Sequence, residues 1–288
     1  MPPLYSDSYY TTLDAVVNQF NFRNLMSQST PLLIAQVTDT HLFAEADKSL
    51  FGLPTAHSLQ AILAQVQLLQ PDLLLLTGDL SQDETATAYE RLRDLVSPLS
   101  IPAYWLPGNH DNPEVVAKIL DSPPISAQKS FTAGGWQFLL LNSQIPGQVG
   151  GYLSPESLDW LDSQLTSSSD KPTLIGLHHQ PLAVDSAWID GSKVANAEEL
   201  LGILDNHPQV KLVIFGHIHQ EFDCWRHNIR YLGTPSTGGQ FKPRSPNFAL
   251  DEIAPGFRWL KLYPDGKFET RVERLSWEVY QKLLNCGS

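Results

Sequence analysis

Five short polar segments of the sequence combine residue types that can bind metal ions or transfer protons. They are Asp39-Thr40-His41, Gly78-Asp79, Gly108-Asn109-His110-Asp111, His178-His179 and Gly216-His217-Ile218-His219. Carboxylates, imidazoles and an amide oxygen together favour Mn, Fe or Zn over Mg or Ca, which prefer all-oxygen sites. Cysteine is absent from all five segments, which argues against a structural zinc site. Seven such side chains suffice for two metal ions if one carboxylate bridges them, leaving positions for water and substrate.

Each polar segment follows an apolar run that predicts a buried strand. These runs span 32–37, 73–77, 101–106, 173–177 and 210–215. Helices are predicted over 55–70, about 84–96, from 113, from 154 and over 196–206, so strands and helices alternate as in α/β proteins. Ligands of α/β sheets bind beyond the carboxyl ends of the strands. If the five strands lie side by side in one sheet, all five polar segments meet along one edge.

The spacing within two of the segments favours a metal site. Asp39/His41 and His217/His219 are two residues apart, and in an extended backbone this spacing puts both side chains on the same face. Taken singly, an Asp or Asn after a strand is typical of a turn or helix cap, and an isolated histidine is more often a surface or core residue. Repetition at five strand ends favours one shared site.

The rest of the chain predicts one domain over residues 31–288, preceded by an N-terminal extension over 1–30. Residues 131–142 predict a hairpin around Gly134-Gly135. Proline follows a capping residue at Asn112 and at Ser154, as at helix starts, and Asn196 with Glu199 fits a capping box. After the last polar segment we expect short antiparallel strands at 221–226, 230–233, 247–253, 257–263 and 267–272.

Composition limits the class of protein. The hydrophobic content of 42% and charged content of 17% are ordinary for a soluble globular protein. The formal net charge of −12, without a basic stretch, argues against a nucleic-acid partner. Cys224 and Cys286 are too far apart to suggest a cysteine metal site, and a disulfide framework is not expected. No secretory signal is apparent and the apolar runs are too short to cross a bilayer, so we expect a cytoplasmic protein without membrane contact.

Taken together, the five segments resemble the motifs of the calcineurin-like metallophosphoesterases, over about Pro31 to Val272. Within that superfamily the chain is most similar to the bacterial cyclic AMP phosphodiesterases of class III. This closer match lies in residues 38–43, 78–83, 216–221 and 235–248. The resemblance implies an α/β fold, a four-layer αββα sandwich of two mixed β-sheets flanked by helices.

The resemblance also implies a ligand set. One metal ion would be held by Asp39, His41, Asp79 and His219, and the other by Asp79, Asn109, His178 and His217, with Asp79 bridging. Of the two adjacent histidines only one can face the metal from a strand end; we expect His178, with His179 behind it or near the substrate. Members of the family commonly carry iron with manganese, with zinc as the alternative, and homodimers occur among them.

The reaction implied is hydrolysis of 3′,5′-cyclic AMP to 5′-AMP by attack of a metal-bridged hydroxide. The expected catalytic residues are Asp79, Asn109, which holds a phosphate oxygen, and His110, which donates a proton to the leaving 3′ oxygen or stabilises the transition state. The expected substrate contacts are His41, Asn109, His110, His179 and His219. In many relatives a carboxylate three residues after the bridging Asp orients the catalytic histidine. Gln82 takes that place here, so Asp83 or another group must orient His110.

Two alternative functions stay open. The metal centre alone does not choose the leaving group, so the substrate could be another small phosphodiester or nucleotide, such as a 2′,3′-cyclic nucleotide or a glycerophosphodiester. A catalytically inactive binding scaffold is the remaining alternative, and loss of ligands would mark it. None of the expected ligands is missing from the sequence.

Overall fold

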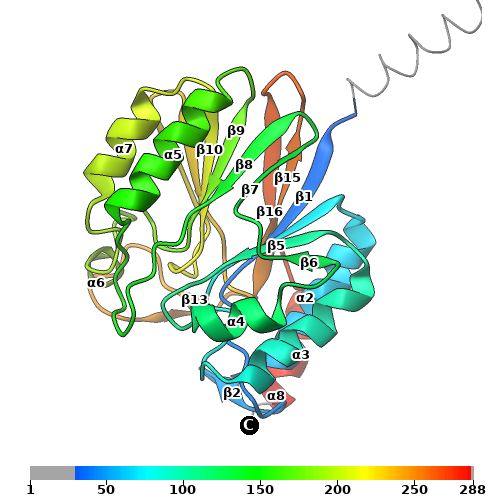
Figure 1. Ribbon diagram of the computed structural model, residues 1–288. Helices are drawn as coiled ribbons and strands as arrows, with labels where there is room; N and C mark the ends of the chain where they lie inside the picture. Colours follow the sequence, from blue (N-terminus) through cyan, green and yellow to red (C-terminus); the bar gives the residue numbers. More distant parts are fainter. Residues whose placement is uncertain (1–29, 287–288) are drawn as a thin grey trace, which may run out of the picture.

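The computed structural model describes residues 30–286. The predicted N-terminal extension lies outside the described residues except for Thr30, and the domain boundary at residue 31 therefore stays a prediction. Within residues 30–286, two six-stranded β-sheets lie face to face at the centre of the molecule (Figure 1).

The two sheets have similar mixed topologies. The first has the order β16(Phe268–Arg274), β15(Gly256–Leu262), β1(Leu32–Val37), β4(Leu73–Thr77), β5(Ala103–Leu106) and β6(Ile125–Ser126). The second has the order β11(Phe222–Arg226), β12(Ile229–Gly233), β10(Val210–Phe215), β9(Thr173–Gly176), β8(Trp136–Leu140) and β7(Ser130–Ala133). The strands that precede the polar segments all belong to parallel pairs.

Helices cover the outer face of each sheet (Figure 1). The first sheet is covered by α2(Thr55–Leu69), α3(Ala86–Val96), α4(Pro113–Ile119) and α8(Trp277–Cys286), and the second by α5(Pro155–Ser167), α6(Ala187–Asp190) and α7(Ala197–Asp205). A short 3₁₀ helix (Ser97–Leu99) and the strand pairs β2(Ser49–Leu50)/β3(Leu53–Pro54) and β13(Gln240–Phe241)/β14(Leu250–Asp251) complete the fold. The helix–sheet–sheet–helix order confirms the four-layer αββα sandwich.

The strand β4 shows why its sequence is continuously apolar. Leu74 and Leu76 pack into the core beneath the helices, whereas Leu73 and Leu75 pack into the core between the two sheets. A parallel strand that is buried on both faces needs apolar residues at every position. Alternation within one four-residue run thus connects two of the three hydrophobic cores found within the described chain.

One condition considered for the strands was not met, and two local expectations were wrong. The strands that precede the polar segments are not in one sheet, because β1, β4 and β5 belong to the first and β9 and β10 to the second. Asn196 does not form a capping box; its side chain accepts from the Leu153 N–H (3.0 Å) and donates to the Leu153 carbonyl (2.8 Å). Of residues 247–253, only Leu250 and Asp251 form a strand.

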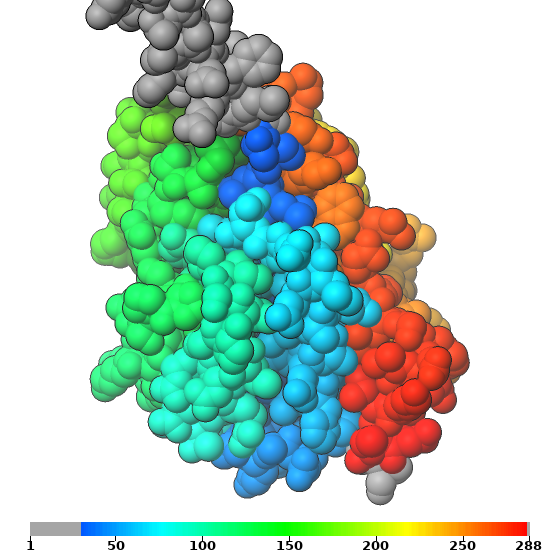
Figure 2. All heavy atoms as spheres, turned by 90° about the vertical axis from the view of Figure 1, so that its right-hand side faces the viewer, coloured from blue at the N-terminus to red at the C-terminus, as the bar shows by residue number. Residues whose placement is uncertain are grey.

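The C-terminal helix α8 has no counterpart among the predicted elements. Its residues Val279, Tyr280 and Leu283 pack against the core of the first sheet, and it lies beside α2 (Figure 2). Among the elements described, no helix is long and apolar enough to span a membrane.

Candidate metal centre

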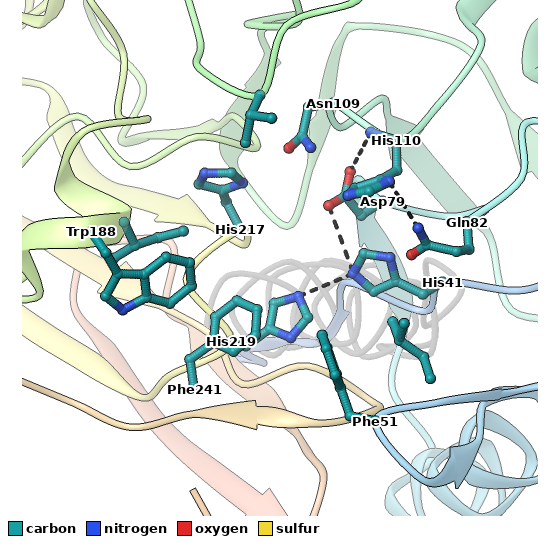
Figure 3. Close-up of a pocket in the computed structure, with 13 residues that line it drawn as sticks. His41, Phe51, Asp79, Gln82, Asn109, His110, Trp188, His217, His219 and Phe241 are labelled. Carbon is teal, nitrogen blue, oxygen red and sulfur yellow. Dashed lines mark hydrogen bonds and ion pairs between the residues drawn. The ribbon is translucent and has the colours of Figure 1, made fainter. Parts of the chain in front are cut away.

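The structure brings the five polar segments together although they come from two sheets. Asp39 and His41 follow β1 and Asp79 follows β4 of the first sheet, while His178 and His219 follow β9 and β10 of the second. Their ligand atoms form overlapping groups in which the atoms lie within 4.8 Å of one another, and His41, Asp79 and His219 line one pocket (Figure 3). The carboxyl ends of strands from both sheets therefore build the site, rather than the edge of one sheet.

The backbone at these positions is not extended. Asp39, His41, Asp79, His217 and His219 have φ values of 53°, 45°, 50°, 64° and 45°, in the left-handed region. The expectation that the i, i+2 pairs share a face because the backbone is extended was therefore wrong. Non-glycine residues rarely adopt this conformation, and where they do, strain is often stored at a functional site.

Glycines let the polar segments approach each other closely. A Cβ atom at Gly108 would lie 2.2 Å from Oδ1 of Asp79, and one at Gly216 would lie 2.1 Å from Oγ1 of Thr38. Neither space can hold a side chain. Glycine at these two positions is thus required by the packing of one loop against the next.

The first group of ligand atoms surrounds His219. Its Nδ1–H donates to the carbonyl of Gly239 (2.8 Å), so Nε2 presents a lone pair. That atom lies 3.0 Å from Nε2 of His41 and 3.3 Å from Oδ1 of Asp39, and Nε2 of His41 is 3.7 Å from Oδ2 of Asp79. Two imidazole nitrogens and two carboxylates facing one another at these distances match the donor set of a transition-metal cation.

The adjacent histidines His178 and His179 play different structural roles. His178 donates from Nδ1 to the Thr77 carbonyl (2.9 Å), and its Nε2 lies 3.3 Å from Oδ2 of Asp79. Both ring nitrogens of His179 contact other groups of the protein, Nδ1 the Ser143 hydroxyl (2.8 Å) and Nε2 a backbone carbonyl (3.1 Å). Of the pair, His178 therefore presents a free nitrogen to the carboxylates, and His179 lies behind it.

The second group adds His217 and Asn109. The Ser192 hydroxyl donates to the carbonyl of Ile189 (2.9 Å) and lies 2.9 Å from Nε2 of His217. Because its one hydrogen is already used, it accepts a hydrogen bond from the Nε2–H of His217. Nδ1 of His217 then carries the free lone pair. Oδ1 of Asn109 is buried. Within the described chain it has no hydrogen-bond partner, and neither do Nε2 of His178 and Nδ1 of His41. Buried polar atoms without partners are rare, and a bound cation accounts for those aimed into the cluster.

Electrostatics at the site also fit cation binding. Burial opposes ionisation of Asp39 and Asp79, but the neighbouring histidines outweigh it and hold both carboxyl pKa values below their usual range. Burial lowers the pKa of His41 to about 4. For His178 burial acts in the same direction, yet the Asp79 carboxylate prevails and raises its pKa to about 9. A cation bound there would take over from His178 the neutralisation of two buried carboxylates.

Gln82, and not Asp83, contacts the expected catalytic histidine. Nε2 of Gln82 lies 3.2 Å from Nδ1 of His110. Asp83 instead shapes its own turn, accepting from the Thr85 hydroxyl (2.8 Å) and from the backbone N–H of Ala44 (2.8 Å). The group that orients His110, left open by the sequence, is therefore an amide.

Asp111 is a structural residue of the site to which the sequence analysis gave no role. Its buried carboxylate accepts from the backbone N–H groups of Leu80, Ser81 and Gly108 at 2.8–3.1 Å and from the Tyr89 hydroxyl at 3.2 Å. It thus ties the loop after β4 to the loop after β5. Its place at the end of the Gly108–Asp111 segment was the available signal.

A pocket of about 180 Å³ opens over the cluster (Figure 3). On one flank lie His110, Asn109 and Gln82. The opposite flank carries the aromatic rings of Phe51, Trp188 and Phe241, and the apolar side chains of Leu50 and Ile189 also line the pocket. The sequence analysis named none of these apolar residues as part of the site. Phe241 lies in the segment 235–248 that carries the closer resemblance, but an apolar residue type alone does not separate a pocket wall from core.

Comparison with known proteins identifies relatives of similar length. The chain is 50% identical over 256 residues to a 3′,5′-cyclic-nucleotide phosphodiesterase from Nostoc sp., covering 88% of this chain and 96% of that protein. It is 40% identical to the 3′,5′-cyclic adenosine monophosphate phosphodiesterase CpdA of Pseudomonas aeruginosa, covering 90% and 95%. The CpdA of Escherichia coli K12 is 43% identical, with 84% and 90% covered.

Solved structures with little sequence identity share the fold. A dimetal phosphatase from Danio rerio superposes with a TM-score of 0.61 at 18% identity, covering 85% of this chain and 99% of that one. A purple acid phosphatase from yellow lupin gives 0.59 at 15% identity, covering 88% and 56%. The sequence model of the calcineurin-like phosphoesterases matches residues 32–221. The chain therefore belongs to the calcineurin-like phosphoesterase family.

Proposed function

We propose that the protein is a metal-dependent phosphodiesterase that hydrolyses 3′,5′-cyclic AMP to 5′-AMP. The observation that supports this most strongly is the cluster of overlapping histidine and carboxylate groups around Asp39 and Asp79, with buried ligand atoms that lack protein partners within the described chain. Relatives at 40–50% identity that are named cyclic nucleotide or cyclic AMP phosphodiesterases support the substrate class.

In this proposal two metal ions, iron with manganese, occupy the two groups. The ligands of the first ion are Asp39, His41, Asp79 and His219, and those of the second are Asp79, Asn109, His178 and His217. Such a pair of ions, when bound, would lower the pKa of a water molecule to supply a nucleophile and would neutralise negative charge on the phosphoryl oxygens. His179 stays outside both ligand sets because its ring nitrogens bind other protein groups.

The chain's own side chains position the diester and move the proton. Asn109 holds a phosphoryl oxygen through its side-chain amide. His110 donates a proton to the 3′ oxygen as the bond from phosphorus to that oxygen breaks, so a neutral alcohol leaves. The backbone N–H of His110 donates to Oδ1 of Asp79 (2.9 Å), which fixes the loop that carries the imidazole. Gln82 holds the ring from its other side.

The test is a substrate panel after metal exchange. The protein is stripped with a chelator, reconstituted with manganese or iron, and assayed with cyclic AMP, cyclic GMP, 2′,3′-cyclic AMP and bis-p-nitrophenyl phosphate. We expect activity that is lost on stripping and restored by metal, with 5′-AMP as the product from cyclic AMP. Restored activity on the 2′,3′-cyclic nucleotide but not on cyclic AMP would replace the proposed substrate and keep the metal chemistry. Full activity without metal would end the proposal.

A further inference from the structure

The apolar flank of the pocket has no use in binding a phosphate. Phe51 lies in the turn between β2 and β3, Trp188 in α6 and Phe241 in β13, and all three line the pocket that contains the metal cluster (Figure 3). Phe248, in the loop after β13, contacts each of these rings. We call these four side chains the aromatic wall. They come from three segments far apart in the sequence, with Phe241 and Phe248 in the same one.

The wall is continuous with the metal cluster. The Phe241 ring stacks on the imidazole of His219, with centroids 4.1 Å apart and planes at 6°. Trp188 meets Phe241 edge-on at 4.9 Å, and Phe51 meets it edge-on at 6.0 Å. A ligand whose phosphate binds at the metal cluster would therefore have the Phe241 ring and its aromatic neighbours directly beside it.

Part of this aromatic surface is exposed. Phe51 is 40% and Phe248 52% exposed, whereas Phe241 is 8% exposed and already stacked on His219. The Phe51 ring rests against Gly239, where a Cβ atom would lie 2.8 Å from Cδ2 of the ring. The carbonyl of Gly239 also accepts a hydrogen bond from Nδ1 of His219. Gly239 therefore contacts both the Phe51 ring and the proposed metal ligand His219. Exposed aromatic rings at the mouth of a concave site are typical of a ligand surface.

We propose that the aromatic wall is the nucleobase site of the phosphodiesterase and that it holds the base by stacking on Phe51 and Phe248. This inference rests on the proposed function and adds to it where the base lies. Stacking on aromatic side chains tolerates different bases because every base presents a π face.

The residues that line the pocket also determine how well it can distinguish one base from another. Apart from the proposed metal ligands, His110 and Gln82, these lining residues are Leu50, Phe51, Val149, Trp188, Ile189 and Phe241. Within this described lining, the indole N–H of Trp188 is the one side-chain hydrogen-bonding group, and Figure 3 shows it on the side of the ring turned away from the histidines. The part of a base edge that lies within this lining therefore meets no side chain that tells adenine from guanine. Cyclic AMP and cyclic GMP should differ by less than about tenfold in kcat/KM, since discrimination of polar groups requires matched hydrogen bonds.

The test compares substrates with and without a base. The manganese-loaded protein is assayed with cyclic AMP, cyclic GMP and the base-free 3′,5′-cyclic phosphate of 1-deoxyribose. The variants are Phe51→Leu with Phe248→Leu, which keep apolar volume and remove the rings, and Phe51→Tyr with Phe248→Tyr, which keep the rings. Trp225→Leu is the control, since Trp225 is 56% exposed but does not line the pocket.

We expect the leucine pair to raise KM for both cyclic nucleotides by about 10- to 100-fold, the range for loss of base stacking, with little change in kcat. KM for the base-free diester should not change, and the tyrosine pair and Trp225→Leu should behave as the wild-type protein. An unchanged KM for cyclic AMP in the leucine pair, or an equal rise for the base-free diester, would overturn the proposal. A preference above about tenfold in kcat/KM for one of the two cyclic nucleotides would contradict the predicted lack of base selectivity.

A binding measurement separates this proposal from the proposed function. Calorimetry on the manganese-loaded wild-type protein compares 5′-AMP with ribose 5-phosphate, which differ by the base. Tighter binding of 5′-AMP that disappears in the leucine pair supports the wall whichever diester is the substrate. Equal affinities of the wild-type protein for the two compounds contradict the wall even if cyclic AMP is hydrolysed.

Discussion

The side-chain amide of Gln82 contacts the imidazole of His110, with 3.2 Å between Nε2 and Nδ1. Either end of the Gln82 amide can pair with Nδ1, its NH2 group with the neutral ring and its oxygen with the imidazolium, which is the form that gives a proton from Nε2 to a leaving oxygen. Because the amide carries no charge, it orients the ring without the field of a carboxylate. In the proposed mechanism Gln82 is thus a positioning residue that acts through His110.

This contact predicts non-additive losses. His110→Ala should lower kcat by about 10²- to 10⁴-fold, the usual range for a general acid. Gln82→Ala should lower kcat by about tenfold with KM and metal content unchanged, because the ring remains but is less well oriented. In the double variant the Gln82 change should cost nothing further, since its effect passes through the missing ring. If the kcat of the double variant instead falls by the product of the two single losses, Gln82 acts independently of His110.

The shared carboxylate predicts loss of both metal ions from one substitution. Asp79→Asn removes the negative charge common to the two groups, so we expect metal content and activity to fall together. Asp83→Asn is the matched control, because that carboxylate lies four residues on in the same loop but binds Thr85 and Ala44. Metal analysis and kcat report the outcome. Full metal occupancy with normal turnover in Asp79→Asn would refute the bridging role.

The adjacent histidines predict opposite phenotypes. His178→Ala should reduce bound metal to about one equivalent, because its Nε2 faces Asp79. His179→Ala should keep both ions and instead lower the free energy of unfolding by about 1–3 kcal/mol, since the buried Ser143 hydroxyl and a carbonyl lose their partner. Metal analysis and denaturant unfolding separate the two. Loss of metal from His179→Ala alone would reverse the assignment.

A lysine away from the site predicts a pH-dependent stability. Lys129 lies over the Trp105 ring, 3.7 Å from its centroid, and donates to the Trp105 carbonyl. Burial lowers its pKa from 10.5 to about 7. Below pH 7 the lysine is charged in both folded and unfolded chains, and the cost of burying the charge is fully present. Between about pH 7 and 10.5 the unfolded chain holds a proton that the folded chain does not, so stability rises with pH.

The measurement is the free energy of unfolding of the wild-type protein minus that of Lys129→Met, from pH 6 to pH 10. We expect this difference to shift in favour of the wild-type protein by about 2 kcal/mol, less than the whole pKa change implies because the side chain is partly exposed. Lys118→Met, at an exposed position of α4, is the matched control. A difference that stays constant over this range contradicts a buried charge at Lys129.

Local sequence patterns predicted most elements of the fold. Continuous apolar runs such as Leu73–Leu76 marked the buried strands, and Asn112 and Ser154 cap α4 and α5 as expected. The division of the strands between two sheets was not predictable from such patterns, because a strand buried on both faces has the same composition in either sheet. It entered through the family resemblance.

The types of the residues predicted which of them belong to the candidate site, but not the backbone geometry that brings them together. The structure brings Asp39, His41 and His219 together as expected, although through left-handed backbone conformations that no side-chain pattern announces. Gln82 was passed over because an amide is not a usual partner for a catalytic histidine. Phe51 and Phe241 were missed since an apolar residue beside a pocket looks like any core residue in the sequence.

The centre draws on both sheets, and this affects how the molecule should respond to chelation. Each proposed ion would be held by side chains of the first sheet, around Asp79, and of the second, around His178 and His219. The ions would then cross-link the loops of the two sheets, each of which has its own hydrophobic core beneath its helices. Removal of the ions should leave both sheets and their helices folded. Amide hydrogen exchange should become faster first in the loops that carry the metal ligands.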